Sequence, residues 1–147
     1  MIGTDRTRPT MGEDSRQDNE AIRSEVEKTF HLLTEAWIRG DMDTMEKYYH
    51  DKILGFEPDC PDPIAGKSKV LAHYRKFLDT GGRIEYLKCR DIRVQPFGDT
   101  ALLTYRFRTG RTLPGGRSIE FTGKETLLFV LQDGIWKLSH WHYSIDK

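Results

Sequence analysis

The chain has 147 residues, of which 37% are hydrophobic and 31% charged, a balance typical of a globular protein of one domain. Its 23 basic and 23 acidic residues are interspersed, which excludes the basic patch of a nucleic-acid-binding or membrane-surface protein. No apolar run approaches the ~20 residues of a membrane span, and the residues after Met1 lack the apolar stretch expected of a signal peptide. We therefore expect a cytoplasmic protein, with Cys60 and Cys89 as free thiols.

The first 16 residues are polar and charged, with almost no apolar side chains. Such a segment cannot bury enough surface to offset the entropy of ordering it, so residues 1–16 are predicted to be a disordered tail. Residues 17–147 contain no linker and no internal repeat, and we assign them to one domain.

Helical periodicity dominates the first half of this domain. Apolar residues recur at steps of three and four from Asp18, and Gly40 ends this first helix. Asp41 caps a short second helix, and a third helix is predicted over residues 67–78. A short strand over residues 52–58, followed by a proline-rich loop, separates the second helix from the third.

Four long strands follow, over residues 83–96, 100–113, 117–131 and 136–145, joined by turns rich in Gly and Asp. Strands of this length predict β-bulges. Within residues 126–131, apolar side chains point to both faces of the strand, so this strand should be covered on both faces. Because three helices cover only one face, we expect a homodimer formed through the other face of the sheet. The alternative is further cover of that face from within the chain.

The last strand carries two histidines among aromatic residues. Strict alternation divides it into two faces, one with Trp136, Leu138, His140 and His142 and one with Lys137, Ser139, Trp141 and Tyr143. The first set is predicted to form a pocket wall and the second set the dimer surface.

Several short motifs occur in a characteristic order along the chain, namely Arg39-Gly40-Asp41-Met42-Asp43, Phe56-Glu57-Pro58, Ala65-Gly66, Asp133-Gly134-Ile135-Trp136 and His140-Trp141-His142-Tyr143-Ser144. With the element order, they resemble the nuclear transport factor 2-like superfamily. The chain resembles its SnoaL-like and ketosteroid-isomerase-like proteins and the association domain of calcium/calmodulin-dependent protein kinase II. The resemblance implies an α+β, cone-shaped half-barrel, in which a curved antiparallel sheet wraps around three N-terminal helices and encloses one central pocket.

The resemblance also implies a site. The carboxylate that moves a proton in ketosteroid isomerases falls on Glu57, whereas the position of their oxyanion-donating tyrosine falls on Leu33. Glu57 is therefore the candidate base, with His140 and His142 as further catalytic candidates that donate to an oxyanion. The alternatives are that Glu57 caps the third helix or pairs with a basic residue, and that both histidines are hydrogen-bonded core residues.

The remaining candidates are ligand contacts. Tyr105 is a possible hydrogen-bond donor in the pocket, and Trp37, Phe107 and Tyr74 are possible aromatic walls, although each side chain is equally suited to the core. A metal held by Glu57 and the two histidines lacks further ligands at fixed spacing, so no metal and no cofactor are expected.

The resemblance, with these candidate residues, implies a protein that binds a small hydrophobic, carbonyl-bearing ligand. It would act as a cofactor-independent isomerase, cyclase or dehydratase by general acid–base chemistry. The alternative is a non-catalytic association or ligand-binding module.

Overall fold

The computed structural model describes residues 11–147, with side chains from residue 18 onward, as three helices and one six-stranded sheet. The elements are α1 (Met11–Arg39), α2 (Met42–Tyr48), β1 (Tyr49–Phe56), β2 (Ile64–Ala65), α3 (Lys67–Asp79), β3 (Arg83–Phe97), β4 (Thr100–Thr112), β5 (Ser118–Gln132) and β6 (Ile135–Ile145). The predicted α+β class and order of elements are confirmed. In this part of the chain, no helix is long and apolar enough to cross a membrane.

The N-terminal prediction falls partly outside this range. Residues 1–10 of the predicted tail lie outside the described residues, so their disorder stays a prediction. The backbone of α1 is helical from Met11, seven residues before the predicted start at Asp18. Residues 11–17 include Glu, Arg and Gln, which have high helix propensity, so the helix extends without the apolar periodicity on which the prediction relied.

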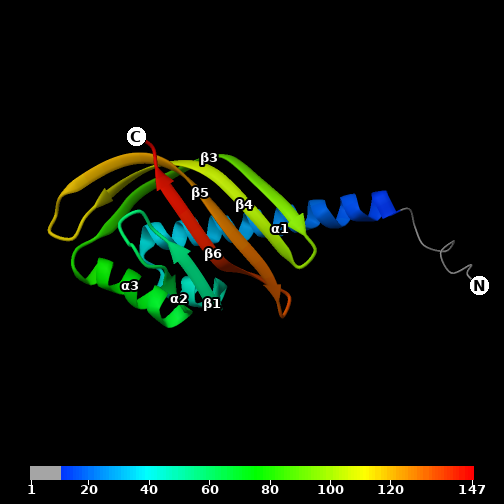
Figure 1. The fold of residues 1–147 in the computed structure, drawn as a ribbon, viewed down its shortest axis with the longest axis horizontal. Coiled ribbons are helices and arrows are strands. Elements are labelled where there is room, and N and C mark those ends of the chain that lie inside the picture. The colour runs from blue at the N-terminus through cyan, green and yellow to red at the C-terminus, as the bar shows by residue number, and fades with distance from the viewer. Residues whose placement is uncertain (1–10) are drawn as a thin grey trace, which may run out of the picture.

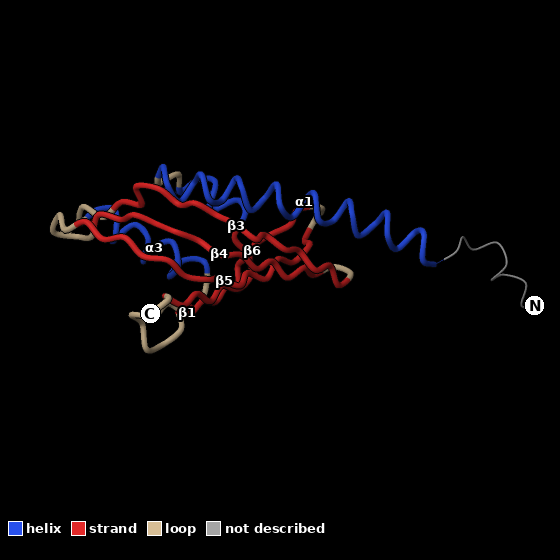
Figure 2. The backbone as a smooth tube through the Cα atoms, turned by 90° about the horizontal axis from the view of Figure 1, so that it is seen from above, coloured by secondary structure: helices blue, strands red, loops and turns tan. Residues whose placement is uncertain are grey.

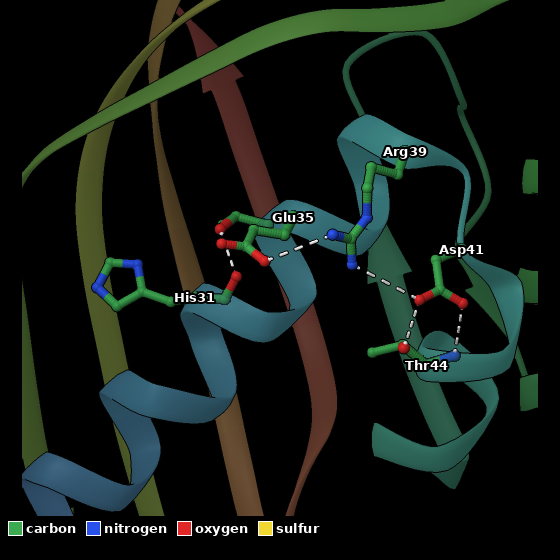
Figure 3. Close-up of polar contacts among 6 residues, drawn as sticks. His31, Glu35, Arg39, Asp41 and Thr44 are labelled. Carbon is green, nitrogen blue, oxygen red and sulfur yellow. Dashed lines mark hydrogen bonds and ion pairs between the residues drawn. The ribbon is translucent and has the colours of Figure 1, made fainter.

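The corner between α1 and α2 follows the Gly-Asp prediction. Gly40 takes a left-handed conformation with a φ of 70°. Asp41 then caps α2, because its carboxylate accepts hydrogen bonds from the Thr44 backbone N–H at 3.2 Å and the Thr44 hydroxyl at 2.7 Å (Figure 3). The Arg39 guanidinium lies 3.8 Å from the carboxylates of both Glu35 and Asp41. These contacts fix the direction in which the chain enters β1.

The sheet has the strand order β2-β1-β6-β5-β4-β3. Neighbouring strands from β3 to β6 are antiparallel, whereas β1 runs parallel to β6. Figure 1 shows the sheet curving over α1, and Figure 2 shows α1 and the strands as separate layers. The two-residue strand β2, which pairs with β1, was not predicted because Ile64 and Ala65 are too few to form a pattern.

The core lies between α1 and the inner face of the sheet. Val26, Phe30 and Leu33 follow one another at helical spacing on α1, and each is fully buried. Across from them, β4 contributes Leu103 and β5 contributes Leu127, which are also fully buried. Burial of side chains of this size stabilises the fold by roughly 1.5–3 kcal/mol each, and it fixes which face of each strand points inward.

A β-bulge in β6 reverses the predicted faces of the last strand. Leu128 pairs with His140 but Phe129 pairs with Leu138, so Ser139 is an extra residue in β6. Before the bulge Leu138 faces inward, as predicted. After the bulge the inward residues are Trp141 and Tyr143, not His140 and His142. The predicted pocket wall of histidines and the predicted dimer surface of Trp141 and Tyr143 are therefore both wrong.

Candidate functional site

A cavity of about 150 Å³ opens between α1, α3 and the inner face of the sheet. Aromatic side chains form much of its wall, among them Trp37, Phe77, Phe107, Trp141 and Tyr143. The volume is close to that of a cavity able to hold one benzene ring. Ligand sites are usually concave, mainly apolar and equipped with a few polar groups, and this cavity has that character.

The four residues proposed from the sequence as ligand contacts, Trp37, Tyr74, Tyr105 and Phe107, all line the cavity. Two of them are held by hydrogen bonds that fix their rings. The Tyr74 hydroxyl donates to the Trp37 carbonyl, and the Trp37 indole N–H donates to the Tyr49 hydroxyl at 2.8 Å. Their position is established by the structure, whereas contact with a ligand stays a prediction.

The main ionisable group inside the cavity is Glu125 on β5. It is partly buried and lies directly across the β4–β5 ladder from Tyr105, whose hydroxyl donates a hydrogen bond to its carboxylate. Burial disfavours the charged carboxylate and raises its pKa to about 7, although the Tyr105 hydrogen bond and the positive charge of Arg111 act in the opposite direction. A carboxyl group with this pKa can both accept and donate a proton at neutral pH.

Arg111 is the positively charged group of the cavity wall. The centre of its guanidinium group lies 5.1 Å from the ring centroid of Phe121 and 5.7 Å from that of Tyr143. Both distances are within the range of a cation–π interaction. Its buried Nε has no hydrogen-bond partner within the described part of the chain. A buried donor left without a partner is costly to the fold.

Tyr49, at the start of β1, supplies a second donor. Its hydroxyl oxygen accepts the hydrogen bond from Trp37, and among the described residues no acceptor takes its own proton. Burial raises the pKa of Tyr49, so the hydroxyl stays protonated at neutral pH. Leu33, the position to which the resemblance assigns the oxyanion donor, is fully buried and does not line the cavity.

Glu57, the base expected from the sequence, lies where β1 ends and the proline-rich loop begins, and it lines the cavity. Its Oε1 is 3.3 Å from Nε2 of His73 on α3, and the two side chains are 26% and 46% exposed. Glu57 is therefore more open to solvent than the buried groups around Glu125, and it is paired with a side chain that the sequence analysis did not single out.

His140 and His142 do not line the cavity. Their rings lie near that of Phe56, with ring centroids 6.2 and 5.6 Å apart, on the outer face of the sheet. The prediction that these histidines share a pocket with Glu57 is wrong, because the bulge at Ser139 turns them outward.

Glu125 and Arg111 were missed by the sequence analysis, although the signal for both was present. Arg111 is on the same face of β4 as Tyr105 and Phe107, four residues beyond Phe107. Glu125 is two residues before the inward-facing Leu127 on β5. Extending both alternation patterns to the ends of their apolar runs would have placed these two charges in the pocket.

Comparisons with known proteins agree with this architecture. Residues 26–146 match the family model described as a SnoaL-like domain. A proposed dehydratase of the NTF2-like family from Streptomyces avermitilis is 22% identical, with 87% of this chain and 98% of that chain covered and a TM-score of 0.74. An NTF2-like protein from Cytophaga hutchinsonii is 17% identical, with coverage of 84% and 98% and a TM-score of 0.75.

The calcium/calmodulin-dependent kinase II hub of S. rosetta is 23% identical to this chain. The match covers 84% of this chain and 95% of that chain, with a TM-score of 0.69. No curated protein matches the chain. At these identities the similarity to solved structures establishes the NTF2-like fold and not the activity.

Proposed function

We propose that this chain, which belongs to the SnoaL-like domain family, binds a small hydrophobic ligand with a carbonyl group and catalyses proton transfer on it. The observation that carries the proposal is the position of Glu125, a carboxylate held by Tyr105 within an aromatic cavity. The reaction class would be isomerisation, cyclisation or dehydration without a cofactor.

In this proposal Glu125 removes a proton from the carbon next to the ligand's carbonyl group. A base with a pKa of about 7 is well matched to reaction at neutral pH. The base thus differs from Glu57, the residue favoured by the sequence. Positioned general bases typically contribute about 10²–10⁴-fold to a rate, so loss of the carboxylate should be easily measured.

Removal of that proton leaves negative charge on the carbonyl oxygen. The guanidinium of Arg111, which lines the cavity, and the hydroxyl of Tyr49 are the groups suited to stabilise it. The cationic guanidinium also favours an anionic intermediate electrostatically, and it acts most strongly where water is excluded. These donors take the role for which the sequence analysis nominated His140 and His142.

The size and walls of the cavity restrict the ligand. A volume of about 150 Å³ suits roughly one six-membered ring. We therefore propose monocyclic ketones, conjugated enones and β-hydroxy ketones as the first compounds to test. Larger polycyclic ligands would require the cavity to open further.

The direct test is exchange of the carbon-bound protons of these compounds in D₂O, followed by ¹H NMR. We expect exchange catalysed by the wild-type chain and lost in Glu125→Gln, with both proteins equally folded by circular dichroism. Glu57→Gln and the double variant His140→Ala/His142→Ala should retain exchange, and Glu120→Gln serves as the control because Glu120 is an exposed carboxylate on the same strand.

Two results would contradict the proposal. If Glu57→Gln abolishes exchange while Glu125→Gln does not, the proton-transfer group is Glu57. If wild type binds a compound by NMR line broadening but exchanges none of its protons, the alternative of a non-catalytic binding module is favoured instead.

We also propose that the protein forms a homodimer through the outer face of its sheet. Leu102, Leu128, His140 and Leu54 are successive partners across β4, β5, β6 and β1. All four are partly exposed, and three are leucines. A second copy would cover this apolar row by an isologous contact.

A cytoplasmic location is the last part of the proposal. Cys60 and Cys89 are free cysteines, which is usual in proteins of reducing compartments. Fractionation of the cells that produce the protein tests this location, and recovery from an oxidising compartment would contradict it.

A further inference from the structure

Three side chains with different donor atoms converge at the mouth of the cavity. They are Glu57, directly after β1, Cys60, in the loop that follows, and His73, on α3. One carboxylate oxygen, the thiol sulfur and one imidazole nitrogen all lie within 4.8 Å of one another. Glu57 Oε1 and His73 Nε2 are 3.3 Å apart.

The backbone explains why these residues meet. The Cys60 N–H donates to the Glu57 carbonyl at 3.1 Å, which closes a tight turn and brings both side chains to one place. The loop then returns to β1, where the Gly66 N–H donates to the Ile53 carbonyl at 2.7 Å, and α3 begins. Proline limits the backbone conformations that this loop can adopt. The three side chains are therefore brought together by a backbone of restricted conformation.

The donor set is one that zinc prefers. Zinc binds thiolate, imidazole and carboxylate groups, and zinc–ligand distances of about 2.0–2.3 Å put tetrahedral donors roughly 3.3–3.8 Å apart. The Glu57–His73 separation of 3.3 Å already meets this requirement. The Cys60 sulfur needs to approach by at most about 1.5 Å, a movement within reach of side-chain rotation.

We propose that Glu57, Cys60 and His73 form a zinc site with three protein ligands. Two of them, Glu57 and His73, also line the cavity, and three protein ligands leave the fourth coordination position open. Three ligands with one open position are typical of zinc that binds water or a ligand, whereas structural zinc is usually enclosed by four protein ligands.

Zinc binding involves no oxidation or reduction. The Cys60 S–H bond breaks, its proton passes to solvent, and the thiolate forms the bond to zinc, while Glu57 and neutral His73 bind through an oxygen and a nitrogen lone pair. The site does not depend on proton transfer at Glu125, so it can exist even if the proposed function is wrong.

The competing explanation is a simple contact between Glu57 and His73 at the surface, with Cys60 nearby by chance. The Cys60 sulfur takes no part in that contact between Glu57 and His73. Evidence for a sulfur–metal bond therefore distinguishes the two, and Cys89 provides a matched control because it is the chain's other cysteine and lies on β3, outside the cluster.

The test uses the full chain, freed of metal by a chelator and titrated with Co²⁺, a spectroscopic substitute for zinc. We expect one equivalent to give a thiolate-to-cobalt charge-transfer band and strong visible absorption of four-coordinate cobalt, both abolished by added Zn²⁺. Cys60→Ser should lose the charge-transfer band and bind zinc more weakly by at least about tenfold. Cys89→Ser should match wild type.

His73→Gln should also weaken binding, and circular dichroism checks that each variant is folded. Absence of the charge-transfer band in wild type would overturn the proposal. Its persistence in Cys60→Ser, or its loss in Cys89→Ser, would do the same. None of these readouts requires an activity.

Discussion

The hydroxyl of Tyr105 donates a hydrogen bond to the carboxylate of Glu125, its direct partner across the β4–β5 ladder. A hydrogen bond to the charged form of a carboxylate lowers its pKa, so this contact partly offsets the effect of burial on Glu125. The pair therefore sets the pKa of the proposed base as well as its orientation.

Replacement of Tyr105 by Phe should raise the pKa of Glu125 above about 7, because the stabilising donor is lost and burial remains. Titration of side-chain carboxyl groups by ¹³C NMR measures the change. Tyr86→Phe is the control, since Tyr86 donates to the exposed Glu120 in an equivalent Tyr–Glu pair. A midpoint of Glu125 that stays the same or falls in Tyr105→Phe would mean that the hydrogen bond does not act as described.

The same carboxylate predicts a pH dependence of stability. The pKa of Glu125 is about 7 in the folded chain against an ordinary value of 4.5, so the folded state holds this proton more tightly than the unfolded state. The resulting stabilisation is fully present below pH 4.5 and is lost as pH rises through 7. A shift of this size corresponds to about 3 kcal/mol at most.

Urea unfolding of wild type and Glu125→Gln at several pH values tests this prediction. The free energy of unfolding of wild type should fall relative to that of the variant as pH rises between 4.5 and 7. The comparison removes the contributions of other carboxylates, which both proteins share. Parallel curves for the two proteins would show that Glu125 titrates in its ordinary range.

Gly55→Ala should destabilise the fold by roughly 1–3 kcal/mol, as overpacking of a filled core does. A Cβ at Gly55 would lie 2.1 Å from atoms of the Trp141 ring, and Trp141 is a residue only 8% exposed. Urea unfolding measures the loss. In a Trp141→Ala background the same substitution should cost much less, and an equal cost in both backgrounds would exclude this contact as the cause.

Leu128→Asp should break the proposed dimer, because it introduces a charge at the centre of the apolar row on the outer sheet face. Light scattering coupled to size exclusion should give a dimer for wild type and a monomer for the variant. Lys124→Asp, an exposed change on the same strand and face, should remain dimeric. A monomeric wild-type protein would contradict the dimer directly.

Much of the fold was predictable because its elements follow simple periodicities. The helical spacing on α1 and the Gly40-Asp41 break predicted the helices of the N-terminal half. Strand alternation predicted that Tyr105 and Phe107 point toward the pocket, and both line the cavity. Each of these patterns involves residues close together in the sequence. The periodic patterns are pronounced because one face of the helix or strand is buried.

The errors arose where position depends on contacts distant in sequence. The bulge at Ser139 is defined by pairing between β5 and β6, and no residue in β6 marks it, so strict alternation assigned His140 to the wrong face. Likewise, Cys60 and His73 are brought together only by the return of the proline-rich loop to β1. Neither relationship is visible in a spacing pattern.

The central claim is that Glu125 is poised to exchange a proton near neutral pH. It is tested most directly by ¹³C NMR titration of the side-chain carboxyl groups in the intact protein, with Glu125→Gln used to assign the resonance. We predict that the Glu125 resonance titrates with a midpoint near 7. A midpoint near the ordinary value of 4.5 would contradict the account.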